Sequence, residues 1–227
     1  MKQKRILIFV LGQIISIVSV AVAMLWSAGR TDWWPAWAVV GVWLIWFASE
    51  DIIILYINPD LLAERLNIPK DAKSWDRALL SILRLGQLAR YILAGLDQRH
   101  AWTNNFPLVA QVLALALCLV TTFLFFWAMA SNPFFSQVAR IQTDRAHIVA
   151  KHGPYSYVRH PAYLAMIMFE IALSLLLASW PAIIAGTLCA GLFVVRTALE
   201  DRVLQSELSG YVDYSRQVRF RLLPGIW

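Results

Sequence analysis

Long apolar runs without a charge constrain this chain more than any other feature. Ile6–Trp26 has 21 residues and Phe106–Met129 has 24, and neither contains Asp, Glu, Lys or Arg. Because an α-helix rises 1.5 Å per residue, about 20 apolar residues cross the hydrocarbon core of a bilayer. With 59% apolar and 15% charged residues, the chain has more apolar surface than a soluble core of this size can bury. We therefore predict an integral membrane protein, and we exclude a disordered or disulfide-stapled chain.

Two further candidate spans contain charges. Pro35–Ile57 carries two acidic residues and begins with a proline, which suits a first helical turn. Ala78–Leu96 is the weakest span because it contains Arg84 and Arg90. It either crosses the membrane with these arginines against protein or lies in the interface. The polar segment Leu61–Asp76 between the two spans predicts a surface helix and a loop.

The last two apolar runs predict a helical hairpin. Tyr163–Trp180 and Pro181–Val195 are joined by a tight turn at Ser179-Trp180-Pro181, and the chain becomes amphipathic from Arg196 onward. The six runs together predict an all-α, polytopic integral membrane protein with about six transmembrane helices. We divide it into N-terminal transmembrane helices with a loop, residues 1–105, and a C-terminal membrane core, residues 106–227.

The basic residues predict how the chain lies in the membrane. With six crossings and the N-terminus inside, 16 of the 20 Lys and Arg residues fall on the inner side, and only Arg30 and Arg99 fall in outer loops. Cytoplasmic loops carry such an excess of Lys and Arg. The excess of positive charge, +6 overall, therefore reflects topology rather than nucleic-acid binding. We expect both termini and the polar segment Asn132–Pro161 to be cytoplasmic, next to membrane lipids.

Polar chemistry is concentrated just before the predicted hairpin. Gly153-Pro154 is a turn signal, and Pro161 follows Arg159-His160 at the expected start of a helix, where free backbone N–H groups line the membrane surface. Tyr155 and Tyr163 offer aromatic faces, which attract cations. Such residues are also common in an interfacial belt. The density of the cluster favours a binding site.

A second cluster lies where the last apolar run ends. Arg196 and Glu200 are four residues apart, and therefore share one face of a helix. They form a simple ion pair, or they act on a ligand: Arg can hold a carboxylate through two hydrogen bonds, and Glu can hold an ammonium group. Charges at this depth in a membrane are costly and are often functional. The residues alone leave both readings open.

Several other sites are not indicated. His147, His152 and His160 are 5 and 8 residues apart, and no Cys, Asp or Glu completes a known ligand pattern, so we predict no metal. No Gly-x-Gly fingerprint, Gly-x-Ser-x-Gly elbow or basic–aromatic groove is present. We therefore expect no nucleic-acid partner. Cys118 and Cys189 lie in apolar runs, as buried cysteines do.

The two clusters together resemble the isoprenylcysteine carboxyl methyltransferase family, within a wider group of membrane phospholipid methyltransferases. The strongest resemblance covers Asn132–Trp227. Asn58–Asp76 is similar, less specifically, to a bacterial branch of the family. The shared pattern is a Gln, a His five residues later, Gly-x-Tyr, Arg-His-Pro-x-Tyr and Arg-x-x-x-Glu, which here are Gln142, His147, Gly153–Tyr155, Arg159–Tyr163 and Arg196–Glu200. Ala165 and Asp201 depart from it, where many relatives have Gly and a second Glu.

The resemblance implies S-adenosyl-L-methionine as cofactor, in a cytosolic pocket formed by residues 106–227. Glu200 would hold its methionine moiety, and Arg196 would bind the acceptor carboxylate, so these two are the candidate catalytic residues. The other implied cofactor contacts are Gln142, His147, Ile148, Val149, Ala150, Tyr155, His160, Pro161, Ala162 and Tyr163.

The main hypothesis is methyl transfer from this cofactor to a lipophilic, membrane-embedded acceptor, a small molecule or a prenylated substrate with a carboxylate. Three alternatives stay open. In the first, the acceptor is a lipid amine, and Glu200 or His160 would serve as a base. In the second, the chain is a membrane reductase that uses NADPH, since sterol reductases are similar to the family in their cytosolic half. In the third, the chain is a non-catalytic carrier, whose intramembrane charges form a polar pathway.

Overall fold

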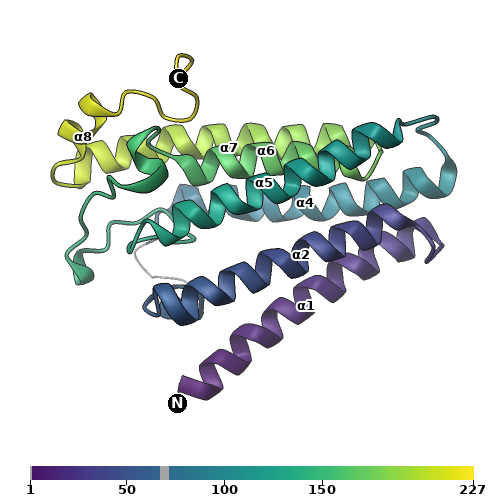
Figure 1. Cartoon of the computed structure of the whole chain (residues 1–227), viewed down its shortest axis with the longest axis horizontal. Helices are drawn as coiled ribbons and strands as arrows, with labels where there is room; N and C mark the ends of the chain where they lie inside the picture. Colours follow the sequence, from purple (N-terminus) through teal and green to yellow (C-terminus); the bar gives the residue numbers. More distant parts are fainter. Residues whose placement is uncertain (1, 67–71) are drawn as a thin grey trace.

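A computed structural model describes residues 2–66 and 72–227, and every regular element in this part of the chain is helical (Figure 1). The prediction of an all-α fold is confirmed. The long helices are α1 (Lys2–Ala28), α2 (Trp34–Ile52), α4 (Ser74–His100), α5 (Leu108–Ala130), α6 (Pro161–Leu176) and α7 (Trp180–Glu207). The short ones are η1 (Ile53–Ile57), α3 (Leu61–Leu66), η2 (Thr143–Arg145), η3 (Gly153–Ser156) and α8 (Tyr211–Gln217).

The six long helices run up and down along one bundle. The short connections between α1 and α2, α4 and α5, and α6 and α7 lie at one end, on the right of Figure 1, whereas α3, α8 and the long loop after α5 lie at the other end. The core forms where α2, α5 and α6 meet: Trp46 packs against Phe126 and Phe169, with ring centroids 5.0 and 5.1 Å away. The polar segments are therefore gathered at a single end of the bundle.

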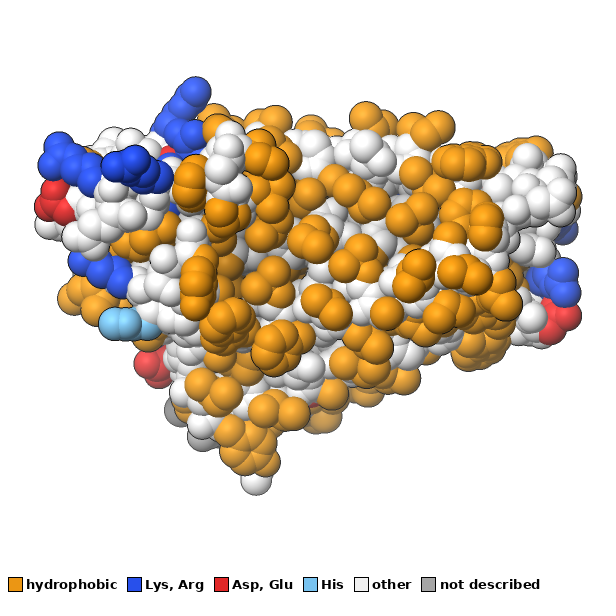
Figure 2. Space-filling model, turned by 45° about the horizontal axis from the view of Figure 1, so that its top comes forward, with side chains coloured by type: hydrophobic (Ala, Val, Ile, Leu, Met, Phe, Trp, Pro, Cys, Tyr) orange, Lys and Arg blue, Asp and Glu red, His pale blue; other side chains and the backbone are white. Residues whose placement is uncertain are grey.

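Within residues 2–66 and 72–227, five helices are long and apolar enough to span a membrane, and the protein is a multi-pass membrane protein. They cover Ile6–Ala28, Trp34–Ile57, Ser74–His100, Leu108–Ala130 and Trp180–Glu207. The sixth predicted crossing, α6, is a shorter apolar helix of 16 residues. Figure 2 shows a broad apolar surface along the bundle, with charged side chains near its two ends. Such a surface suits contact with lipid chains.

The predicted hairpin is present, but its turn lies two residues earlier than expected. Leu177–Ser179 connects α6 to α7, and Trp180 and Pro181 already belong to the first turn of α7. The Ser179 side chain accepts a hydrogen bond from the backbone N–H of Ala182, so it acts as the N-cap. Pro181 fits here because a proline in the first helical turn lacks an N–H that would have no partner.

Helix α4 lies within the bundle, alongside α1 and α7, and the interfacial alternative for it is not supported. It starts at Ser74, so the segment Leu61–Asp76, which we predict to be a surface helix and a loop, ends earlier than expected. Helix α3 covers its first six residues, and residues 67–71 lie outside the described residues. Arg90 is buried and forms an ion pair with Glu170 of α6. Helix α4 belongs to the first of the two predicted parts, residues 1–105, and packs against α7 of the second part. The division of the chain into two parts stays a prediction.

Candidate functional site

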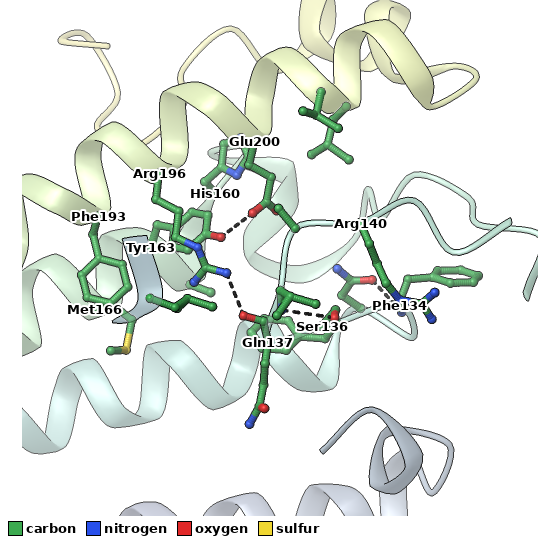
Figure 3. Close-up of a pocket in the computed structure, with 18 of the residues that line it drawn as sticks. Phe134, Ser136, Gln137, Arg140, His160, Tyr163, Met166, Phe193, Arg196 and Glu200 are labelled. Atoms are coloured by element: carbon green, nitrogen blue, oxygen red, sulfur yellow. Dashed lines mark hydrogen bonds between the residues drawn. The ribbon is translucent and has the colours of Figure 1, made fainter. Parts of the chain in front are cut away.

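A cavity of about 560 Å³ opens at the polar end of the bundle. It is lined by residues of α2, α4, α6, α7 and α8 and of the loop that follows α5. Figure 3 shows Arg196 and Tyr163 at its centre, with the apolar Phe193 and Met166 on one side and the loop from Phe134 to Arg140 on the other. Its size is that of a typical small-molecule site.

Arg196 is held by an acidic residue from the N-terminal part of the chain. Its Nε and Nη2 atoms donate to Oδ1 and Oδ2 of Asp76 in α4, at 2.6 and 3.1 Å. Nη2 also donates to the carbonyl oxygen of Gln137 at 2.7 Å (Figure 3). Asp76 is fully buried and accepts a further bond from the N–H of Ala139 at 2.7 Å. The third guanidinium nitrogen of Arg196, Nη1, has no hydrogen-bond acceptor among the described residues.

Glu200 lies one helical turn beyond Arg196 and pairs with a different residue. Its Oε2 atom accepts a short hydrogen bond from the Tyr163 hydroxyl (Figure 3). The ring of Tyr163 also lies 5.2 Å from the Arg196 guanidinium, in cation–π contact. The simple ion pair between Arg196 and Glu200 is therefore not what the structure shows, although both side chains line the same cavity. Within the described chain, the second oxygen of Glu200 has no donor.

Asp201 fixes one wall of the cavity. This fully buried carboxylate accepts two hydrogen bonds from Arg159, at 2.8 and 3.0 Å, and lies 3.2 Å from Nε2 of His160. The hydroxyl of Tyr211 in α8 and the Nε atom of Arg221 also donate to it, at 2.9 and 2.8 Å. Burial, with the nearby Asp201 carboxylate, raises the pKa of Tyr211. Asp201 thus joins α7, the start of α6 and the C-terminal segment.

The loop after α5 folds around the buried side chain of Gln142. Its Nε2 atom donates to the carbonyl of Phe134 at 2.6 Å, and its Oε1 atom accepts from Arg145 at 2.9 Å. The N–H of Gln142 donates to Nδ1 of His147 at 3.3 Å, and the His147 ring stacks on Phe134. Burial lowers the pKa of His147 to about 4, and the charges of Arg140 and Arg145 act in the same direction. His147 is therefore neutral near pH 7.

The predicted turn at Gly153-Pro154 is also present, and it places Tyr155. Gly153 has a positive φ of 61°, and a Cβ atom there would lie 2.4 Å from Oγ of Ser131, so only glycine fits. Tyr155 is buried and lines the cavity, and the Tyr214 hydroxyl donates to its carbonyl at 2.7 Å. Burial raises the pKa of the Tyr155 hydroxyl, which keeps this ring uncharged.

Most of the residues that the sequence singles out meet around the cavity. Those that line it are His147, Val149, Ala150, Tyr155, His160, Ala162, Tyr163, Arg196 and Glu200. Gln142, Ile148 and Pro161 do not line it: Gln142 supports the loop from inside, Ile148 is 66% exposed, and Pro161 begins α6. Among the described residues, no group of three His, Cys, Asp or Glu side chains has the arrangement of a metal site.

Sequence reasoning missed the contribution of α4. Asp76, Arg77 and Arg84 lie on this helix, and the two arginines line the cavity. The sequence predicts a polar surface segment that ends at Asp76, whereas the carboxylate of Asp76 is fully buried. A signal was available, since a helix that starts at Ser74 places Asp76 in its first turn, where acidic residues are favoured. The partner, Arg196, is 120 residues away, and no local pattern indicates it.

Known proteins resemble this chain in both sequence and fold. Residues 113–206 match the model of the isoprenylcysteine carboxyl methyltransferase family. A protein-S-isoprenylcysteine O-methyltransferase from Tribolium castaneum is 23% identical over 181 residues, which are 79% of this chain and 62% of that protein. The chain thus spans less than two thirds of this relative. The solved structure of a eukaryotic intramembrane Ras methyltransferase of the same family superposes with a TM-score of 0.57, at 18% identity, over 94% of this chain and 75% of that one.

The matched region contains every cavity residue that the sequence patterns identified, from His147 to Glu200, but it excludes Asp76, Arg77 and Arg84. The chain is therefore similar to the isoprenylcysteine carboxyl methyltransferase family, in sequence over residues 113–206 and in fold over most of its length.

Proposed function

We propose that this protein transfers a methyl group from S-adenosyl-L-methionine to a carboxylate on a lipophilic acceptor within the membrane. The observation that carries the proposal is the shared cavity of Arg196 and Glu200, at the end of an apolar bundle. The name of the Tribolium castaneum relative describes the same reaction type on an isoprenylcysteine. A prenylated cysteine is accordingly the acceptor class that we propose.

The residues around the cavity fit this cofactor. The unpartnered oxygen of Glu200 suits the ammonium of its methionine moiety. The rings of Tyr155 and Tyr163 are uncharged aromatic surfaces, which suit a sulfonium. Val149, Val203 and Leu204 form an apolar part of the lining, which suits the adenine ring. When bound, S-adenosylmethionine supplies an electrophilic methyl group, whose transfer to a carboxylate oxygen leaves a thioether and an ester without moving a proton.

The protein's own part in this reaction is to position the acceptor. A carboxylate is ionised at pH 7, so no general base is required. Asp76 and Gln137 fix the guanidinium of Arg196 and leave Nη1 to donate to the acceptor. Because Asp76 compensates the charge of Arg196, this hydrogen bond orients the carboxylate without strongly reducing its nucleophilicity. The remaining contribution is alignment and exclusion of water by the apolar surroundings.

The proposal divides the two roles between two residues, and this division can be measured. Arg196→Ala should abolish methyl transfer to an S-prenylated N-acetylcysteine and leave the binding of S-adenosylhomocysteine nearly intact. Glu200→Ala should weaken that binding, because it removes the ammonium partner. Titration calorimetry with S-adenosylhomocysteine decides, with the exposed Arg202→Ala on the same helix as control. Equal loss of binding in both variants contradicts the division, and a response to NADPH alone would indicate a reductase instead.

A further inference from the structure

The charges around Arg196 do not by themselves attract an acid. Asp76 compensates Arg196 through two hydrogen bonds, and Glu200, one turn away, adds a negative charge. The other arginines of the lining that lie outside α4 are paired as well, Arg159 with Asp201, Arg65 with Glu50 and Arg140 with Asp144. An acceptor carboxylate therefore needs positive charge from elsewhere in the lining.

Helix α4 supplies two such charges. Arg77 and Arg84 both line the cavity and are both exposed, and no ion pair joins either to another described residue. They are seven residues apart, so they lie on one face of α4, two turns from each other. Ser81 lies between them and also lines the cavity. These three side chains form a polar strip on a helix that otherwise qualifies as a membrane span.

The surroundings of Arg84 are those of a lipid-facing residue. Its neighbours Ile82, Leu85 and Leu88 are apolar and 53%, 68% and 44% exposed. Arg84 follows Ser74, the first residue of α4, by ten positions, which is about 15 Å along the helix axis. A charged side chain at such a depth is costly unless it meets an opposite charge. Arg90, six residues further along α4, is paired with the carboxylate of Glu170, whereas Arg84 has no acidic partner within the described chain.

We propose that Arg84, with Arg77 and Ser81, attracts the anionic head of an amphiphile as it enters the cavity, before Arg196 orients that head, and that the head is the carboxylate of the methyl acceptor. The inference rests on the proposed function and adds a selection step to it. An acid is attracted to Arg84, while its neutral methyl ester is not. The strip thus favours substrate over product, and methylation weakens the contact that holds the molecule in the cavity.

The test compares three amphiphiles that share one 15-carbon prenyl chain and end in a carboxylate, a carboxamide or a phosphate. Their affinities are measured on the full chain in phosphatidylcholine nanodiscs, with and without S-adenosylhomocysteine. We expect the wild type to prefer the carboxylate over the amide by about tenfold or more, as one charge-assisted hydrogen bond provides. Arg84→Gln should reduce this preference to within about twofold, and Arg84→Lys should retain part of it.

Arg99→Gln is the matched control, since it removes the same charge from the same helix at an exposed residue outside the cavity. It should keep the wild-type preference. Equal binding of acid and amide by the wild type, or an unchanged preference in Arg84→Gln, overturns the proposal. Tighter binding of the phosphate than of the carboxylate assigns the strip to a lipid headgroup and overturns the acceptor assignment. Because binding is read without methyl transfer, an Arg84-dependent preference stands even where no methylation occurs.

Discussion

Asp76 and Arg196 are 120 residues apart in the chain and form a two-pronged, buried ion pair, with contacts of 2.6 and 3.1 Å. The pair joins the first turn of α4 to α7. It also reaches the loop after α5, because the N–H of Ala139 and the carbonyl of Gln137 complete its hydrogen bonds. The residue that orients the acceptor in our proposal therefore depends on the half of the chain outside the family match.

The first prediction concerns this pair. Asp76→Asn should destabilise the protein by about 3 kcal/mol or more, because it leaves the Arg196 charge buried without a counterion. Thermal unfolding in detergent measures the effect. Asp144→Asn is the control, since Asp144 pairs with Arg140 from a position with 63% side-chain exposure and should change little. Adding Arg196→Gln to Asp76→Asn should recover stability but not methyl transfer, and failure to recover it would show that the two residues do not act as a pair.

A second prediction concerns Asp201. Asp201→Asn removes the charge that Arg159, Arg221 and the Tyr211 hydroxyl all contact. The C-terminal segment should then detach, so that hydrogen exchange in α8 accelerates, and stability should fall by about 3–5 kcal/mol. Asp213→Asn in α8 is the control, because that carboxylate is 74% exposed in its pair with Arg216. Unchanged exchange in α8 would mean that the carboxylate does not hold this wall.

Local sequence patterns identified most of the fold, because each membrane span is determined by one continuous run of apolar residues. The run Phe106–Met129 predicts α5 to within two residues at its start and one at its end, since apolar length alone determines such a helix. The turn at Gly153 and the helix start at Pro161 follow from single residues with restricted or unusual backbone geometry. For the same reason, the motif residues on the loop, α6 and α7 could be expected to meet near the membrane surface.

Contacts between distant charged residues could not be predicted in this way. Asp76 was expected at the end of a polar surface segment, but it is the buried partner of Arg196. Asp201 was a departure from the family pattern, and in the structure it joins three segments. The i, i+4 spacing correctly puts Arg196 and Glu200 on one face, yet each has another partner. Sequence spacing indicates which residues share a face, whereas the partner across the bundle depends on tertiary packing.

A third prediction follows from the low pKa of His147, which burial brings to about 4. An unfolded histidine titrates near 6.5, so between about pH 6.5 and 4 the unfolded chain binds a proton that the folded chain does not. Stability should therefore fall as the pH decreases through this window. Protonation would also prevent Nδ1 from accepting the hydrogen bond of Gln142. Binding of S-adenosylhomocysteine should weaken over the same range.

His147→Gln removes the titrating group, so this variant should show a flatter pH dependence of thermal stability between pH 4 and 6.5. His152→Gln, at an exposed position of the same loop, is the control and should follow the wild type. If the His147 variant and the wild type lose stability in parallel, another group is responsible for the acid sensitivity.

The last prediction concerns the close contact between α6 and α7. A Cβ atom at Gly186 would lie 2.0 Å from Oγ of Ser174 and 2.8 Å from the carbonyl oxygen of Glu170. The hydroxyl can rotate, but the carbonyl belongs to the backbone of α6. Gly186→Ala should therefore push the helices apart and lower the unfolding temperature. It should also disturb Glu170, the partner of Arg90.

Gly191 provides the matched control, because it lies on the same helix and a Cβ atom there has nothing within 4 Å. Gly191→Ala should be neutral or should stabilise by up to about 1 kcal/mol, as alanine is the better helix former. Combining Gly186→Ala with Ser174→Ala should recover only part of the loss, since the contact with the Glu170 carbonyl stays. Full recovery would show that the hydroxyl alone sets the spacing, and equal behaviour of the two glycine variants would show that the hairpin does not require close approach at Gly186.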